Sequence, residues 1–414
     1  MIKIVSYKLS HYRNIGTADL NFEHYNVIIG TNNSGKSNFI QSFGFLDFVI
    51  NGSADLVSRA FENGFKYSLY EKILPDNHYI NEDAEAIPRI GFQLDLENTE
   101  TKRRFSYSLT LAFQMSGSLP LNPSFYIYSE SLFYKDLGKP GTPVKIFGRK
   151  EKEVSYGADF PKFKSATDVS PAFSVIRVLQ LLGADNPAYD DAITSLNQVL
   201  KTPVFYFSPT ELTKNSKDKL GIYNGRVVAF ELEEEIIALE NTHNWNIFKS
   251  ALHHVLGIND IWTTSLPMVK NNQVDPKGIK FLTFAHAKSL KSLSDLSDGS
   301  ILLIALIVKV LSSHHDLFFI EEPENSTHPK ALVDLVNFLQ SFAEHKQFII
   351  TSHSIVLLNK SKTDQIITAR STEDGMSEFE NVSNRKELKA RLRSGISNFA
   401  DELFFEQNVE EEFE

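Results

Sequence analysis

The sequence contains no cysteine, which excludes disulfide bonds, cysteine-ligated zinc, iron–sulfur clusters and a catalytic thiol. It also has no excess of basic charge. The formal net charge of −10 provides no overall positive field for nucleic acid, so DNA binding would need a local basic patch. The apolar content of 42% is sufficient for a full hydrophobic core. Because the lack of cysteine fits a reducing compartment, we expect a cytoplasmic protein.

Long apolar segments and internal repeats are absent as well. The longest apolar stretch, residues 301–311, contains Lys309 and is too short to cross a bilayer. The apolar run within residues 1–7 is too short for a signal peptide, so we expect no membrane association. No heptad pattern persists along the chain and no repeat occurs at solenoid periods, which excludes a long coiled coil and a solenoid.

A glycine-rich segment between a strand and a helix is the most informative feature of the sequence. The apolar residues before it predict a buried strand, and residues 38–51 predict a helix. Between them lies Gly30-x-x-x-x-Gly35-Lys36-Ser37, the phosphate-binding loop in its required context. The two glycines let the backbone close around a phosphate, towards which consecutive N–H groups point. The Lys36 ammonium can reach the β- and γ-phosphates of ATP, and the Ser37 hydroxyl can ligate Mg²⁺.

A second apolar strand, predicted at residues 316–320, runs into the acidic sequence Glu321-Glu322-Pro323-Glu324. Carboxylates at the C-terminal end of a parallel strand lie where ligands bind in open α/β sheets. There, Glu321 would hold Mg²⁺ or its water shell, and Glu322 would act as the general base for an attacking water. An ordinary acidic turn is the alternative, and the spacing to the neighbouring motifs makes it the weaker one.

Two further motifs lie on either side of this acidic strand in the sequence. Ser297 occupies a capping position before the helix predicted at 301–311, and with Asp298 and Gly299 it would leave a helix N-terminus open to an anion. Downstream, another buried strand ends just before His353, which could contact a γ-phosphate. Taken singly, such residues are more often an ordinary helix cap and a structural histidine. Their order along the chain favours function.

The order of these motifs resembles that of ABC-type ATPases, most closely the SMC/RecF/OLD-like branch. The matching segments are the Walker A loop 30–37, the signature 296–300, the Walker B strand 317–322, the D-loop 324–329 and the switch histidine His353. The phrase Glu322-Pro323-Glu324-Asn325-x-x-His328-Pro329 and the opening Tyr12-Arg13-Asn14 are typical of this branch. The resemblance implies an α/β P-loop NTPase fold, namely an ABC-type head with a mixed or parallel core sheet, an antiparallel β subdomain and a helical insertion.

Hydrophobic patterns predict the remaining elements. Alternating apolar residues indicate strands at 2–9 and 18–22, an antiparallel hairpin at 90–96 and 105–113, and a strand at 125–129. We predict short strands and loops at 136–164, helices at 170–200 (starting at Ser170-Pro171) and 226–256, a buried strand at 203–207 and a polar loop at 211–219. The predicted domains are an N-terminal ATPase lobe at 1–135, a helical, loop-rich insertion at 136–285 and a C-terminal ATPase lobe at 286–414.

The resemblance also implies roles for individual residues. Glu322, His353 and Lys36 would be catalytic, Ser37 and Glu321 would hold the metal, and Ser297, Asp298 and Gly299 would act on a second subunit. Nucleotide would be bound by Gly30, Asn32, Asn33, Ser34, Gly35, Lys36, Ser37, Asn38, Arg13 and Asn14. Two positions depart from the usual family pattern, because Glu321 replaces an aspartate and the signature reads Ser-Asp-Gly. The Q-loop glutamine is not assigned; Gln93 and Gln114, both in predicted strands, are the candidates.

The family arrangement further implies an oligomer. The signature helix of one subunit closes over the nucleotide that the loop of another subunit holds. A chain with one set of motifs is therefore expected to form a head-to-tail dimer, or a higher homo-oligomer, with composite sites for ATP and Mg²⁺.

The segment after His353 bears on the biological role. About 60 residues follow His353, including a basic helix predicted at 386–393 and an acidic tail at 410–414, too few for the Toprim nuclease domain of OLD nucleases. We therefore expect an ATPase that controls a separately encoded effector, such as a nuclease, in prokaryotic anti-phage defence. Two alternatives remain open. One is a RecF-like DNA-repair ATPase that binds DNA through basic residues 102–104 or 386–393; the other is a slow-turnover scaffold or sensor in which ATP holds the dimer together.

Overall fold

The computed structural model describes residues 1–52, 89–116, 122–160, 167–183, 186–206, 222–223, 226–227, 232–270, 273–325, 327–372 and 375–384. Within these residues, a 15-stranded sheet has the order β10-β11-β9-β15-β16-β3-β17-β18-β2-β1-β4-β5-β6-β7-β8. Its strands are β1 (Ile2–Tyr12), β2 (Ile15–Asn21), β3 (Tyr25–Ile29), β4 (Ile90–Asn98), β5 (Arg103–Ser116), β6 (Asn122–Asp136), β7 (Val144–Lys150), β8 (Glu153–Tyr156), β9 (Val204–Tyr206), β10 (Ile222–Tyr223), β11 (Arg226–Val227), β15 (Leu317–Glu321), β16 (Gln347–Ser352), β17 (Ile366–Ser371) and β18 (Ser377–Asn381).

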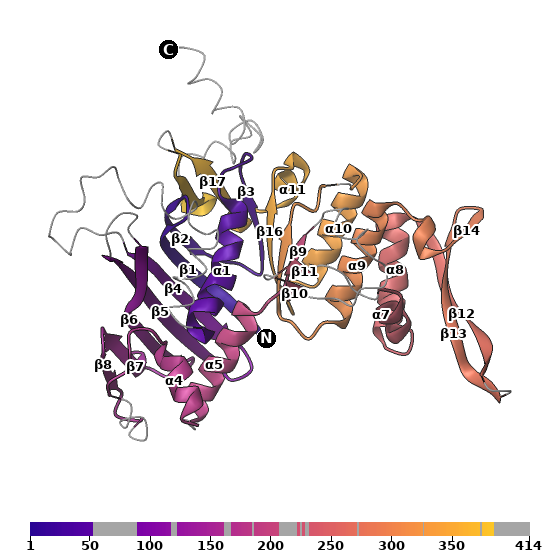
Figure 1. Ribbon diagram of the computed structural model, residues 1–414. Helices are drawn as coiled ribbons and strands as arrows, with labels where there is room; N and C mark the ends of the chain where they lie inside the picture. The colour runs from indigo at the N-terminus through magenta and orange to yellow at the C-terminus, as the bar shows by residue number, and fades with distance from the viewer. Residues whose placement is uncertain are drawn as a thin grey trace, which may run out of the picture.

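The helices pack on both faces of this sheet. They are α1 (Lys36–Asn51), α4 (Val175–Leu181), α5 (Pro187–Leu200), α7 (Leu232–Leu239), α8 (Asn244–Leu256), α9 (Asp298–Ser312), α10 (Pro329–Ser341) and α11 (Ile355–Lys360). In Figure 1, α1 and α5 lie on one side of β16, and α8, α9 and α10 lie together on the other. In the part of the chain that the structure describes, the helices fall short of the length and apolarity that a membrane span requires.

The centre of the sheet is parallel and buried on both faces. β15 pairs with β9 and β16, and β3 pairs with β16 and β17, all in parallel. Every residue of β3, β15 and β16 is buried. Ile28 packs in the core that α1 and α5 complete, whereas Val27 packs in the core that α9 and α10 complete. Two covered faces explain why these strands are continuous apolar runs in the sequence.

The rest of the sheet is a mainly antiparallel wing, as the alternating pattern predicts. β4 is buried at every second residue and pairs with β5, with Ile90 opposite Leu111. The wing joins the parallel centre through the hairpin of β17 and β18, which lies between β3 and β2. No strand was predicted at residues 366–381. β18 shows no apolar alternation, because two of its three buried residues, Ser377 and Asn381, are polar.

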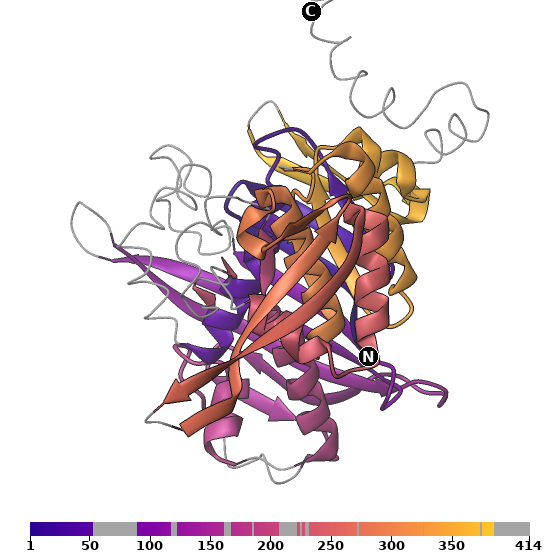
Figure 2. The same cartoon turned by 90° about the vertical axis from the view of Figure 1, so that its right-hand side faces the viewer.

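A second sheet, formed by β12 (Ile258–Lys270), β13 (Gln273–His286) and β14 (Ser289–Lys291), was not predicted at all. β12 and β13 form a long hairpin that projects beside α8, as Figures 1 and 2 show. Its inner face buries Ile261 and Phe284, while Trp262 remains 38% exposed. Register shifts at two points interrupt the alternation on which strand prediction depends.

Two predicted helices are each divided in the structure. Within 170–200, α4 begins after the N-cap Ser174 and α5 after the N-cap Asn186, so Ser170-Pro171 does not start a helix. The carbonyls of Ser170 and Phe173 instead accept hydrogen bonds from Arg149, which holds this segment as a turn. Within 226–256, α7 and α8 are separate helices. The predicted loop at 211–219, the basic helix at 386–393 and the acidic tail lie outside the described residues.

A buried glutamine connects the wing to the parallel centre. The side chain of Gln347, at the start of β16, is fully buried. Its oxygen accepts a hydrogen bond from the Ile4 N–H at 2.8 Å, and its nitrogen donates to the carbonyls of Ile4 at 2.8 Å and Glu23 at 2.9 Å. One amide therefore satisfies backbone groups of two other segments, and this explains a polar residue in an apolar strand.

Replacing this glutamine should destabilise the whole fold. We expect Gln347→Ala to lower the free energy of unfolding by about 2–4 kcal/mol, because it leaves buried backbone groups without partners. Urea denaturation followed by circular dichroism measures the change. The matched control is Gln340→Ala, whose amide makes a single surface hydrogen bond to Lys360 and should change stability by less than about 1 kcal/mol. Equal effects of the two substitutions would contradict this role.

Candidate active site

The loop at residues 30–35 joins β3 to α1, as the sequence predicts. Asn33 and Gly35 have positive φ values of 67° and 85°. A Cβ on Gly30 would lie 2.2 Å from the Ala369 carbonyl oxygen and 2.6 Å from Ser34 Oγ, so only glycine fits there. Gly35 is the N-cap of α1 and provides no side-chain hydrogen bond to the first turn. The loop therefore leaves a helix N-terminus for an anion.

Lys36 folds back over this loop. Its ammonium donates hydrogen bonds to the carbonyls of Gly30 at 2.9 Å and Thr31 at 2.7 Å. Burial lowers the pKa of Lys36, and the nearby carboxylates of Glu322, Glu324 and Glu321 oppose that shift. The loop carbonyls thus hold the ammonium, and three carboxylates act on it electrostatically.

The two predicted metal ligands meet in the structure. Ser37 Oγ lies 3.3 Å from Glu321 Oε2 and donates a hydrogen bond to it. Glu321 ends β15 and is paired with Thr351 of β16, which in turn lies next to the end of β3. A hydroxyl and a carboxylate suit Mg²⁺, which takes few protein ligands and completes its shell with water and phosphate oxygens. No cluster of three or more His, Asp or Glu side chains suited to a metal occurs in the described residues.

Glu322 adopts an uncommon backbone conformation. Its φ is 49°, in the left-handed region, which costs a non-glycine residue roughly 1–2 kcal/mol. The Glu322 N–H donates to the Thr351 carbonyl at 2.9 Å, and Asn325 Nδ2 donates to Glu322 Oε2 at 2.8 Å. These contacts hold the carboxylate at the end of the sheet. Backbone strain of this kind is concentrated at functional sites.

His353 follows β16, and its side chain is 43% exposed. Its Nδ1 lies 3.2 Å from Glu324 Oε1, and its backbone N–H donates to the same oxygen at 2.7 Å. Glu324 was placed in the D-loop by the sequence but was not predicted as a site residue. The only signal for it was a third carboxylate in the run Glu321-Glu322-Pro323-Glu324.

The predicted residues Arg13, Asn14 and Asn38 form one network over the first turn of α1. Arg13 Nη1 donates to Asn38 Oδ1 at 2.7 Å and to Gln41 Oε1 at 2.5 Å. Asn38 Nδ2 donates to Asn14 Oδ1 at 2.7 Å, and Asn14 Nδ2 donates to Ser377 Oγ at 2.7 Å. Gln41 was missed because a polar residue on a helix carries no motif. The network brings the turn after β1 to the phosphate-binding loop.

Several buried oxygens at the site have no hydrogen-bond partner among the described residues. They are Ser34 Oγ in the loop, Thr351 Oγ1 at the end of β16 and Glu324 Oε2. Asn32 and Asn33 are exposed at the tip of the loop. Buried polar atoms are normally paired, so these atoms fit a site that a polar ligand completes. The residues present therefore suit ATP with Mg²⁺.

The signature residues lie elsewhere in the same chain. Ser297 is the N-cap of α9, as predicted, and its Oγ accepts from the Ser300 N–H at 3.4 Å. Asp298 begins the helix and Gly299 is buried in its first turn. Figure 1 places α9 between α10 and α8, apart from α1 and its loop. Within one chain, α1 and α9 pack in different cores of the protein.

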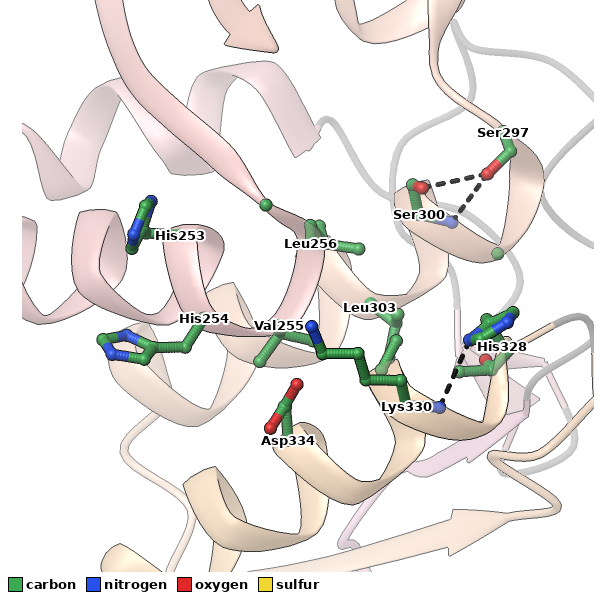
Figure 3. Close-up of a pocket in the computed structure, with 14 residues that line it drawn as sticks. His253, His254, Val255, Leu256, Ser297, Ser300, Leu303, His328, Lys330 and Asp334 are labelled. Carbon is green, nitrogen blue, oxygen red and sulfur yellow. Dashed lines mark hydrogen bonds between the residues drawn. The ribbon is translucent and has the colours of Figure 1, made fainter. Parts of the chain in front are cut away.

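A pocket of about 440 Å³ opens beside the start of α9. Figure 3 shows Ser297 and Ser300 on one side of it, and His328 and Lys330 from the start of α10 on another. His328 caps α10, because its Nδ1 accepts from the Lys330 N–H at 3.2 Å. Two helix N-termini thus meet at one concave surface.

The remaining candidates have other surroundings. Gln93 lies in β4, which β17, β18, β2 and β1 separate from β3, and Gln114 lies one strand further out in β5. The Q-loop glutamine stays unassigned. In the basic cluster, Arg103 pairs with acidic partners at 3.0 and 3.3 Å, and Arg104 pairs with Glu97 at 3.0 Å. The charges of these arginines are thus balanced locally.

The packing of Gly30 generates a sharp prediction. In Gly30→Ala the new methyl would displace the loop from Ala369, and we expect ATP affinity to fall by about tenfold or more, a loss of at least ~1.4 kcal/mol. Isothermal titration calorimetry with Mg²⁺ and ATP measures it. Gly44→Ala is the matched control, because a Cβ there meets nothing within 4 Å and should raise stability by about 1 kcal/mol without changing affinity. Unchanged affinity in Gly30→Ala would contradict the assignment of the loop.

The comparisons with known proteins address the same segments. Residues 239–359 match the family model described as "AAA domain, putative AbiEii toxin, Type IV TA system". No curated protein sequence matches the chain. Three similar solved structures are SMC heads. One is an SMC head bound to the C-terminal winged-helix domain of ScpA (14% identity, 92% of this chain and 99% of that chain, TM-score 0.47).

The second is the SMC head domain from Thermotoga maritima (12% identity, 92% and 98% of the two chains, TM-score 0.41). The third is an SMC head with an extended coiled coil bound to the C-terminal domain of ScpA, derived from Pyrococcus furiosus (11% identity, 95% and 100%, TM-score 0.42). The family match spans the signature, the Walker B strand, the D-loop and His353. Residues 239–359 therefore resemble this family of AAA domains.

Proposed function

We propose that the chain binds ATP with Mg²⁺ and hydrolyses it to ADP and phosphate. The contact between Ser37 Oγ and Glu321 Oε2 carries this proposal, because it joins two motifs that lie 284 residues apart in the sequence. A hydroxyl after the phosphate-binding loop and a carboxylate at the end of a neighbouring strand are the two protein groups that such a metal site needs.

The remaining groups then have distinct roles. The Lys36 ammonium would give up its hydrogen bonds to the loop carbonyls and would donate to β- and γ-phosphate oxygens instead. Mg²⁺ held by Ser37 and Glu321 would supply positive charge to the same phosphates. Glu322 would take the proton of a water that attacks the γ-phosphorus, while the bond from that phosphorus to the β–γ bridging oxygen breaks. His353 would contact the γ-phosphate from the end of β16.

The active site would be completed by a second copy of the chain. Ser297 and Gly299 are available at the start of α9, and they lie apart from the loop of their own chain (Figure 1). A helix N-terminus is a favourable anion site, so it gains a ligand when a phosphate arrives from another subunit. We infer a head-to-tail dimer, or a higher oligomer built from the same contact, with the pocket of Figure 3 beside the junction.

The biological role proposed here is control of a separately encoded effector, in OLD-like anti-phage defence. The description of the matched family names a toxin of a type IV toxin–antitoxin system, which is a two-component setting. Native mass analysis of the chain co-expressed with the products of neighbouring genes, with and without ATP and Mg²⁺, tests this role. A chain that captures no such product under either condition would overturn it.

Removal of the proposed base should separate binding from hydrolysis. We expect Glu322→Gln to lower the rate of phosphate release by about 100-fold or more while ATP affinity changes little, since the amide cannot accept the proton of water. A coupled phosphate assay and calorimetry measure the two quantities. The exposed Glu344→Gln serves as the matched control and should behave as the wild type. Equal turnover in Glu322→Gln would show that another group is the base and would favour the slow-turnover scaffold.

A mixing experiment tests the composite site. Lys36→Ala and Ser297→Arg should each be inactive alone, because each destroys both sites of its homodimer. In an equimolar mixture, about half of the dimers would be mixed, and each of these would contain one intact site, giving about one quarter of wild-type activity. The phosphate assay at equal total protein concentration measures it. If activity does not return although the variants exchange subunits, the two residues act within one chain.

A further inference from the structure

Glu324 connects the turn after β15 to the end of β16. Its Oε1 accepts hydrogen bonds from Ser352 Oγ at 2.7 Å and from the His353 N–H at 2.7 Å, and the same oxygen lies 3.2 Å from His353 Nδ1. One carboxylate oxygen therefore contacts both the backbone and the ring of His353. The neighbouring carboxylate, Glu322, has a different partner, Asn325.

The carboxylate of Glu324 is largely buried. Its side chain is only 11% exposed, and its second oxygen, Oε2, is buried without a hydrogen-bond partner in the described chain. A buried carboxylate is costly unless its charge is compensated. Glu324 also acts electrostatically on Lys36, so its charge is felt at the phosphate-binding loop.

The geometry at His353 defines what the contact does. The contact with Glu324 engages Nδ1 of the ring, and Nε2 is the other ring nitrogen. A histidine whose one nitrogen is held by a carboxylate has a defined orientation and proton position at the other nitrogen. Without Glu324, the side chain of His353, which is 43% exposed, would be free to rotate.

We propose that Glu324 is the positioning residue of His353, and that it fixes the ring so that Nε2 faces the γ-phosphate. This inference rests on the proposed ATPase function for its kinetic consequence, whereas the contact between Glu324 and His353 can be tested without hydrolysis. Because Glu324 and Glu322 lie in the same turn, the orientation of the His353 ring depends on the position of that turn. A movement of this turn would displace the base and the histidine together.

The kinetic test uses the full chain and Glu324→Gln. We expect kcat to fall by about 10- to 100-fold with ATP affinity within about threefold of the wild type, because a misplaced group costs rate more than binding. In a His353→Gln background, Glu324→Gln should cause no further loss, since Glu324 acts through His353. Additive losses, or a loss expressed in affinity alone, would overturn the proposal.

Two variants distinguish positioning from charge and from folding. Glu324→Asp keeps the charge near Lys36 but withdraws the oxygens from His353, and we expect it to lose kcat as Glu324→Gln does. Full activity in Glu324→Asp would assign the effect to the field at Lys36 and overturn positioning. The exposed Glu378→Gln is the matched control for loss of one carboxylate and should retain wild-type kcat.

A spectroscopic test stands independently of hydrolysis. In nucleotide-free protein with ¹⁵N-labelled histidine, the signal of His353 is identified by its disappearance in His353→Gln. Glu324→Gln should shift the Nδ1 resonance of this signal, and Glu378→Gln should not. If the wild type hydrolyses no ATP, the proposed function fails, yet this shift still decides the contact. An unchanged His353 signal in Glu324→Gln would refute the contact itself.

Discussion

The parallel pairing of β16 with both β3 and β15 is the constraint on which the candidate active site depends. It aligns the ends of three strands, with Thr351 of β16 opposite Ile28 and Glu321. The phosphate-binding loop follows β3, and His353 follows β16. Glu321 is the last residue of β15, and Glu322 comes directly after it. Because parallel strands end at the same edge of a sheet, groups from distant parts of the chain converge there without long reaching side chains.

The polar residues inside this apolar centre stabilise the same alignment. Gln347 joins the first residue of β16 to β1 and to the turn before β3, and Asp316, just before β15, accepts a hydrogen bond from the Ile2 N–H at 2.7 Å. The antiparallel wing is therefore attached at the end of the strands opposite to the active site. Buried hydrogen bonds of this kind specify register, since a shifted strand would leave them unpaired.

Sequence patterns predicted the features that depend on local chemistry. The loop, the burial of β3 and β15, the alternation of β4 and β5 and the cap at Ser297 were all predictable, because propensity, burial and capping agree at each. The long hairpin of β12 and β13 was not, since its register shifts break the alternation. The positive φ of Glu322 and the contacts of Glu324 and Gln41 were not predictable either. They arise only when strands that are far apart in sequence become neighbours.

The separation of the signature from the loop decides how the site can be regulated. Within one chain, Ser37 after the loop contacts Glu321 at the end of β15, whereas Ser297 lies at the start of α9, which packs in a different core from α1. In the proposed ATP site, one chain by itself would therefore contact the phosphates from one side only. If the second side comes from another copy, ATP binding and dimerisation are coupled. ATP binding then favours dimerisation by the same free energy by which dimerisation favours ATP binding. The turn that contains Glu322 and Glu324 leads from β15 into α10, whose first residues line the same pocket as Ser297. It is thus the segment through which closure of a dimer would reach the catalytic groups.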